Sequence, residues 1–438
     1  MKRTPLFIAV VLLAIGLALV ACSSTPAPTA APTTPPNTAP QPTAAPAAPL
    51  IEVPFLTGWQ GSAHADAKAE AFNHWNTATP AEVPVDCARC HSTTGYQDFL
   101  GADGSAAFAV DKAQPIGQVI TCVACHNTAT ANLTSVTFPS GLKIEGLGPE
   151  ARCMQCHQGR ASGATVDAAI KKAALTDDDT VSPDLGFTNI HYLAAGAMLY
   201  GSEAAGGYQY TDQLYDMKFR HVPGKDTCLG CHNQHTLEVK VDECTACHKD
   251  AKTKDDLKNI RMNGSLADYN GNGDVKEGIA AELDGLRTTL YSTIQAYAKD
   301  VSKTPIVYDT ATYPYFFIDT NGNGQSDKDE LVAANAFKAW TGRLAKAAYN
   351  YQTSIKDPGF FAHNAKYAIE LMYDSIADLS TKLSAKIDMT KMARNDSGHF
   401  AGINMPFRDW DAEGEVPFRC AKCHTSDGLP TFVAAAGT

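Results

Sequence analysis

The chain has 438 residues and a formal net charge of −11. This length allows two or more domains. The acidic balance argues against a nucleic-acid ligand and favours basic partner proteins or cationic surfaces. Beyond the first twenty residues, no stretch of the sequence is apolar enough to span a membrane.

The N-terminus has the features of an export signal. Residues 1–21 combine a basic start with a short apolar run, which is the layout of a secretory signal peptide. The run ends in Leu19-Val20-Ala21-Cys22, which resembles the lipobox of bacterial lipoproteins. The resemblance implies that Cys22 is lipidated and anchors the exported chain to the outer face of a membrane, at the cell surface or facing the periplasm. An ordinary signal peptide followed by a chance cysteine is the alternative.

Residues 22–50 form the predicted tether. Pro, Ala, Thr and Ser make up almost all of this stretch, so it has too little apolar surface to fold. Proline-rich linkers extend by roughly 3 Å per residue. We therefore expect a disordered linker that holds the folded body away from its anchor.

The twelve cysteines after Cys22 form six pairs, and each pair has the spacing Cys-x-x-Cys and is followed directly by histidine. Two such thiols can add to the two vinyl groups of one haem, and the histidine can then bind the iron from the proximal side. Zinc ribbons, redox dithiols and disulfides also use paired cysteines, but none of them requires the histidine. The six motifs are Cys87, Cys90 and His91; Cys122, Cys125 and His126; Cys153, Cys156 and His157; Cys228, Cys231 and His232; Cys244, Cys247 and His248; Cys420, Cys423 and His424.

With these motifs the chain resembles the multihaem c-type cytochromes. The resemblance implies six haem c groups and electron transport through them. It also implies a fold of helices and loops wrapped around haem, mainly α with few strands.

Seven further histidines are candidates for the distal side of the irons: His64, His74, His191, His221, His235, His363 and His399. An internal repeat ranks them, because His64 precedes Trp75 and the first motif as His399 precedes Trp410 and the last. His74 has no counterpart in the second copy, so we expect it to be the spare histidine. The pairing of the other six with individual haems stays open, and methionine is the alternative ligand.

Three regions follow the linker. Residues 51–251 hold five motifs, residues 252–398 form a predicted helical subdomain, and residues 399–438 hold the sixth motif. Apolar residues recur every three or four positions at 279–301, 331–344 and 369–383, which predicts three amphipathic helices. We expect His363 to open the third helix.

Two loops of the helical region resemble calcium loops. The later one places oxygen ligands at the required positions, with a glycine at the sharp turn: Asp319, Asn321, Asn323, Gln325, Asp327 and Glu330. The earlier one matches in its first half, and Glu277 would have to replace the last ligand: Asp268, Asn270, Asn272, Asp274 and Glu277. One or two structural Ca²⁺ ions are predicted, and a solvated Asn-Gly turn is the alternative.

The last repeat ends soon after its motif, whereas the first continues into a second motif. This difference predicts a shortened or truncated member of a family whose longer relatives carry more haems.

The ligand count favours an electron carrier over an enzyme. Two imidazoles on every iron leave no open position for a substrate. The resemblance implies electron transfer at the cell surface to partner proteins or extracellular acceptors. Some hexahaem relatives stack into filaments, which a lipid anchor disfavours here. The alternatives are an oxidoreductase of the nitrite, hydroxylamine or tetrathionate type with one open haem, and a calcium-stabilised scaffold.

Overall fold

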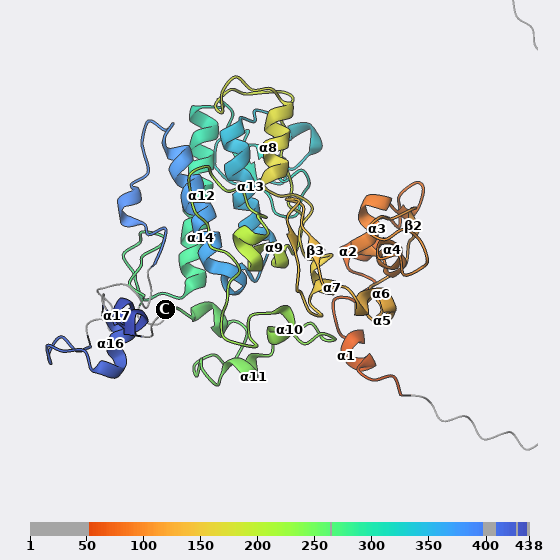
Figure 1. Ribbon diagram of the computed structural model, residues 1–438. Helices are drawn as coiled ribbons and strands as arrows, with labels where there is room; N and C mark the ends of the chain where they lie inside the picture. The colour runs from red at the N-terminus through yellow and green to blue at the C-terminus, as the bar shows by residue number, and fades with distance from the viewer. Residues whose placement is uncertain (1–51, 263–264, 397–408, 426–427, 436–438) are drawn as a thin grey trace, which may run out of the picture. The chain divides into compact units, whose positions relative to one another are not determined.

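The computed structural model describes residues 52–262, 265–396, 409–425 and 428–435 (Figure 1). The chain divides into two compact units, residues 1–53 and 54–438, and every helix and strand described below lies in the second. The predicted signal, Cys22, the linker to residue 50 and His399 lie outside the described residues.

Short helices dominate the first half of the large unit. In chain order they are α1 Leu56–Gln60, α2 Glu70–Asn73, α3 Val85–His91, α4 Thr93–Phe99, α5 Cys122–Cys125, α6 Thr128–Ala131, α7 Ala151–Met154, α8 Gly163–Lys172, α9 Ala195–Tyr200, η1 Gly201–Glu203, α10 Cys228–Cys231, α11 Val241–Cys244 and η2 Asp256–Asn259. Three antiparallel pairs of very short strands accompany the helices of the unit: β1 Glu82–Val83 with β2 Gln114–Pro115, β3 Val136–Thr137 with β4 Lys143–Ile144, and β5 Ile306–Tyr308 with β6 Phe316–Ile318. The prediction of a mainly helical and looped chain with few strands is confirmed.

Three long helices pack together in the second half: α12 Ile279–Asp300, α13 Gly342–Lys356 and α14 Phe360–Ser380 (Figure 1). Most of the residues that carry the periodicity of α12 are fully buried, among them Leu283, Leu286 and Leu290. The first and third predicted helices are therefore confirmed. Short elements complete the chain: η3 Ala333–Asn335, η4 Met389–Lys391, α16 Phe418–His424 and α17 Gly428–Ala435.

The second predicted helix was placed wrongly. The helix begins at Gly342, because the hydroxyl of Thr341 accepts a hydrogen bond from the backbone N–H of Leu344 at 3.1 Å and caps the first turn. Phe337 and Trp340 are buried in the core, but they reach it from the irregular segment before the helix. Apolar spacing alone does not separate a helix from a buried segment that leads into it.

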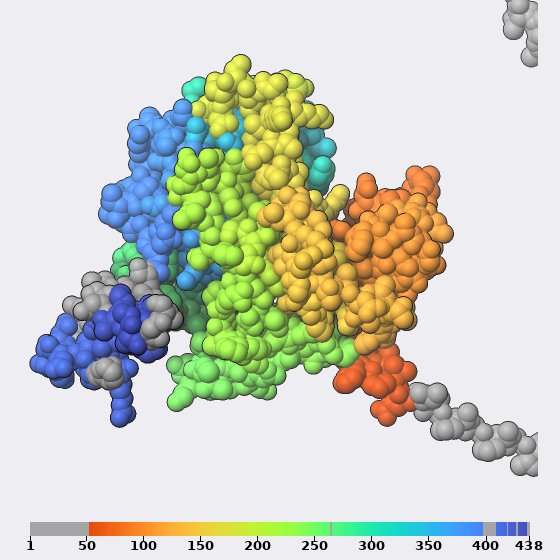
Figure 2. Space-filling view, in the orientation of Figure 1, coloured from red at the N-terminus to blue at the C-terminus, as the bar shows by residue number. Residues whose placement is uncertain are grey.

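The helical core is continuous with the region that carries the first motifs. Met198 of α9 is buried among the long helices, while its neighbour Ala197 belongs to a second core around Tyr96 and Met154. Tyr349 of α13 joins that second core. On the face shown in Figure 2, the segment around residues 160–230 covers part of the long helices, in agreement with the contacts of α8 and α9 with α13 and α14.

None of the described helices has the length and apolar character needed to cross a membrane.

Candidate functional site

The six motifs lie on or at the edge of short helices. Residues three and four positions apart share one face of a helix, so the two cysteines and the histidine of a motif project to the same side. In the first motif, α3 places Cys87, Cys90 and His91 in this way. The twelve motif cysteines are free thiols, as attachment to haem requires.

Five motif histidines each face a second histidine from a distant part of the chain. The distances between ring centres are 5.9 Å for His91 and His191, 6.3 Å for His126 and His235, 6.3 Å for His157 and His64, 6.4 Å for His232 and His363, and 5.9 Å for His248 and His221.

This separation fits two ligands of one metal ion. A metal–imidazole bond measures about 2 Å, and the ring centre lies about 1.1 Å beyond the nitrogen, so opposed ligands have centres about 6.2 Å apart. The five distances lie between 5.9 and 6.4 Å. The histidine pairs therefore fit a haem iron held from both faces.

Backbone carbonyls orient three of the motif histidines. Nδ1 of His91, His157 and His232 lies 2.7, 3.2 and 3.0 Å from the carbonyl oxygens of Ala71, Leu193 and Leu237, respectively. A carbonyl oxygen only accepts, so Nδ1 must donate and Nε2 keeps the lone pair that an iron needs.

Two turns with the same sequence pattern each serve two sites. Both read Asn-x-His-x-Leu, at residues 189–193 and 233–237. The asparagine side chain accepts a hydrogen bond from the backbone N–H of the histidine, at 2.8 Å in the first turn and 2.9 Å in the second. In the first turn, His191 faces the histidine of the first motif, and the carbonyl of Leu193 orients the histidine of the third. In the second turn, His235 faces the histidine of the second motif, and the carbonyl of Leu237 orients the histidine of the fourth. This pattern is visible in the sequence, and our sequence analysis missed it.

The leucine of each turn has a backbone conformation that is rare for its residue type. The φ angle is 56° at Leu193 and 66° at Leu237, in the left-handed region. The conformation costs of order 1 kcal/mol and persists where the surroundings fix it. It turns each leucine carbonyl toward a motif histidine.

Burial keeps several of these imidazoles neutral, which is the form that binds a metal. It lowers the pKa of His64 to about 4, with a further contribution from His157. Burial, helped by the charge of Arg160, also lowers the pKa of His191 to about 4. A ligand that is already deprotonated need not release a proton when iron binds.

His363 has a different environment. Burial opposes its charged form, but the carboxylate of Asp357, 2.7 Å from Nδ1, outweighs this effect and raises the pKa of the imidazole. His363 was predicted to open a helix. It ends the first turn of α14, and the following residue, Asn364, breaks the helical geometry with φ −165° and ψ 82°.

His74 faces none of the motif histidines across such a gap. Its Nδ1 lies 2.6 Å from Oε1 of Glu70, and its ring packs edge-on against Trp75. Both side chains of this ion pair are largely exposed. This surface environment is compatible with the spare role predicted for His74.

The predicted internal repeat is visible in three dimensions. Trp75 packs against His91 with ring centres 5.2 Å apart, and Trp410 packs against His424 at the same distance. The helices α3 and α16 each start after a proline and end at a hydroxyl residue whose side chain bonds back to the helix. The two copies therefore present their motif histidines in the same local setting.

Neighbouring motifs touch through their thiols. A hydrogen bond from Cys156 lowers the pKa of Cys90 to about 6 and raises that of Cys156. A similar contact links Cys153 to Cys228 and raises the pKa of Cys228. The third motif therefore lies beside both the first and the fourth.

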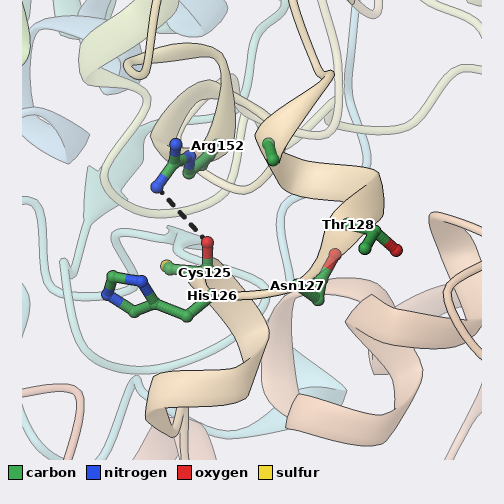
Figure 3. Close-up of a pocket in the computed structure, with 6 residues that line it drawn as sticks. Cys125, His126, Asn127, Thr128 and Arg152 are labelled. Atoms are coloured by element: carbon green, nitrogen blue, oxygen red, sulfur yellow. Dashed lines mark hydrogen bonds between the residues drawn. The ribbon is translucent and has the colours of Figure 1, made fainter.

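An open hollow of about 390 Å³ lies beside the second motif (Figure 3). Cys125, His126 and Arg152 line it, and one guanidinium N–H of Arg152 donates to the carbonyl of Cys125 at 3.3 Å. The Nε of Arg152 is buried and bonds to no described residue. An unsatisfied buried donor beside a motif suits an acidic group such as a haem propionate.

The later candidate calcium loop closes around its acidic residues. Asp319 accepts hydrogen bonds from the backbone N–H groups of Gly322 and Gly324, and Glu330 accepts one from Thr320. The side-chain amides of the two asparagines donate to Asp327 at 2.7 Å. The loop follows β6, so it lacks the leading helix of a helix–loop–helix, as expected.

In the earlier loop a second carboxylate, Glu282, lies beside the predicted Glu277. Glu277 accepts from the amides of Asn270 and Asn272, as Asp327 does in the later loop. The carboxylate of Glu282 accepts a hydrogen bond from the backbone N–H of Tyr269, as Glu330 does from Thr320 in the later loop. Glu282 also forms an ion pair with Arg261. The sequence analysis missed Glu282 because it lies on α12, beyond the twelve-residue pattern.

Within the described parts of the chain, no group of three His, Cys, Asp or Glu side chains is gathered to hold a metal ion. A calcium ion in either loop would therefore also need amide and carbonyl oxygens as ligands.

Known proteins similar to this chain carry c-type haem. The family model described as "Cytochrome c7 and related cytochrome c" matches residues 70–165. The chain is 28% identical over 405 residues to the C-type polyheme cytochrome OmcB of Geobacter sulfurreducens, and 30% identical over 408 residues to the C-type polyheme cytochrome OmcC of the same species. The alignments cover 75% and 76% of this chain but 49% and 48% of the relatives, so it spans about half their length. No solved structure matches it.

Proposed function

Since the chain belongs to the multihaem c-type cytochromes, we propose that it transports electrons through six covalently attached haems outside the cytoplasm. The number six rests on the six Cys-x-x-Cys-His motifs. The observation that carries the proposal is the set of five opposed histidine pairs, each of which includes the histidine of a different motif.

The histidine pairs decide what this chain can do with bound haem. A haem iron takes up and releases one electron and keeps its ligands while doing so. The paired imidazoles would hold each of these five irons from both sides and would leave no position on the metal for a substrate. Cys156 lies close to Cys90 and Cys153 lies close to Cys228, so haems attached to these motifs would be close neighbours.

For the sixth motif we propose His399 as the distal ligand of the haem held by His424. The five pairs use the other candidates, and His74 is bonded to Glu70. The equivalent Trp–His packing in both repeats supports a ligand role for His424.

Film voltammetry of the haem-loaded protein separates a carrier from an enzyme. We expect reversible one-electron waves that do not change when nitrite, hydroxylamine or tetrathionate is added. A catalytic current with any of the three would replace the carrier by the oxidoreductase alternative.

We further propose that the chain is exported and lipidated at Cys22, and that it exchanges electrons with redox proteins or extracellular acceptors. The sequence of residues 1–21 and the linker to residue 50 support this location. Mass spectrometry of the membrane fraction should find an acylated N-terminal cysteine. An unmodified Cys22 in a soluble fraction would contradict the anchor.

We also propose that calcium binds in the two loops and has a structural role. The backbone N–H groups that hold Asp319 and Asp268 give both loops the same turn. Each loop immediately precedes part of the helical core, so a bound ion would fix where that part begins.

A further inference from the structure

The pair formed by His232 and His363 differs from the other four in the partner of its distal histidine. Among the ten paired histidines, His363 is the one whose ring nitrogen meets a carboxylate, with 2.7 Å between Nδ1 and Oδ2 of Asp357. The hydrogen bonds of His91, His157 and His232 go to neutral backbone carbonyls.

The carboxylate is buried and held by a backbone hydrogen bond. Asp357 follows the last residue of α13 and is 2% exposed. Its Oδ1 accepts a hydrogen bond from the backbone N–H of Gly359 at 3.1 Å, which leaves Oδ2 for His363. The two bonds together keep Oδ2 directed at the imidazole.

Gly359 makes room for the same ring. A Cβ at this position would lie 2.6 Å from Cε1 of His363 and 3.1 Å from its Nδ1. The first distance is shorter than real Cβ contacts, so any other residue here would require the imidazole to move. The turn 357–359 thus both binds the ring and leaves space for it.

The neighbouring cation does not neutralise the carboxylate. Lys356 is buried, but its ammonium donates to the carbonyl of Thr310 at 3.0 Å and lies 3.6 Å from the centre of the Tyr192 ring. The charge of Asp357 therefore acts on the imidazoles beside it, on His363 through a direct hydrogen bond and on His157 through its charge alone.

A carboxylate that accepts the Nδ1 proton makes a ligating imidazole a stronger donor, and its buried negative charge favours the ferric state over the ferrous state. We infer that Asp357 is a positioning residue that lowers the reduction potential of the haem held by His232 and His363. The inference rests on the proposed ligation of that haem by both histidines.

The test is a redox titration of the full haem-loaded chain and of Asp357→Asn, followed by optical and EPR spectra. Asparagine keeps the shape and removes the charge. We expect one of the one-electron components to become easier to reduce by about tenfold in its equilibrium constant, which is 59 mV for one electron. The component of the haem held by His157 should shift less, because Asp357 acts on that histidine through its charge alone, and the remaining components should stay in place.

Two variants serve as controls. Asp357→Glu keeps the charge and should restore most of the parental curve. Asp300→Asn removes an exposed carboxylate at the end of α12 and should leave all components unchanged. Superimposable titrations of Asp357→Asn and the parent, at equal haem content, would overturn the inference.

Two further measurements keep the outcomes distinct. His363→Ala should convert one haem to the high-spin state. If His363→Ala leaves all haems low-spin, the proposed ligation by His363 is wrong. If His363→Ala gives a high-spin haem but Asp357→Asn titrates like the parent, the ligation holds and only the role of Asp357 is wrong. If Asp357→Asn loses haem, the parent protein labelled with ¹⁵N-histidine can be studied by pulsed EPR instead. The coupling of the Nδ1 proton should then differ from the others at one axial histidine. Equal couplings at all axial histidines would overturn the inference.

Discussion

At the scale of single residues, the sequence predicted the type of ligand but not the pairing. The Cys-x-x-Cys-His motif is local chemistry, so all twelve cysteines and six proximal histidines can be read directly from the sequence. A distal histidine meets its iron through the tertiary fold. His64 faces His157, and His126 faces His235, across many intervening residues. The internal repeat marks His64 and His399 in the sequence, and the repeated Asn-x-His-x-Leu turn marks His191 and His235.

His235→Ala tests one distal ligand without disturbing a core. The ring of His235 stacks on Phe55 at 4.4 Å, and Phe55 is 67% exposed, so little buried packing is lost. We expect one haem to become high-spin and to bind cyanide, because its sixth position opens. The matched control is His74→Ala, whose ring is bonded to Glu70 at the surface. A fully low-spin His235→Ala protein would show that the second haem has another ligand.

At the scale of helices and strands, the clearest apolar periodicity gave the best prediction. The helix α12 was predicted well because its apolar stripe is buried from Leu283 to Tyr297. The start of α13 was predicted wrongly because Phe337 and Trp340 continue the spacing into a segment that is not helical. The cap at Thr341 followed by glycine is the signal that would have placed it.

Close helix packing at a glycine supports the first motif. A Cβ at Gly95 of α4 would lie 2.3 Å from the carbonyl oxygen of Ala88 on α3, and Gly428 stands in the same relation to Ala421 in the second repeat. We expect Gly95→Ala to force α4 away from α3 and to destabilise the protein by about 1–3 kcal/mol, with loss of haem from the first motif.

Haem content per chain and the unfolding midpoint measure this effect. Gly186→Ala is the control, because nothing lies within 4 Å of its Cβ. If Gly95→Ala has the stability and haem content of the control, the contact between α3 and α4 does not support the motif.

At the scale of the whole molecule, the predicted helical subdomain shares its core with the region of the first motifs. The core of residues 252–398 includes Leu185 and Met198 from that region. Composition shifts mark where motifs are dense, but they do not show which side chains share a core. The shared core also carries the turn at Asp357, so it connects the helices to one of the haem sites.

Removal of calcium should weaken this shared core. At a free calcium concentration of 100 times Kd, one site that binds only the folded state adds about 2.7 kcal/mol to the free energy of unfolding. We therefore expect EGTA to lower the thermal unfolding midpoint of the parent and to have a smaller effect on Asp319→Asn. Equal midpoints with and without calcium, together with no calcium bound in equilibrium dialysis, would show that the loops are ordinary Asn-Gly turns.

The spin state of the haems tests the central claim most directly. Opposed imidazoles on every iron predict an EPR and near-infrared magnetic circular dichroism spectrum in which all haems are low-spin with two histidine ligands. The spectrum should not change with cyanide or nitrite. A persistent high-spin haem that binds either ligand in the intact protein would contradict the account.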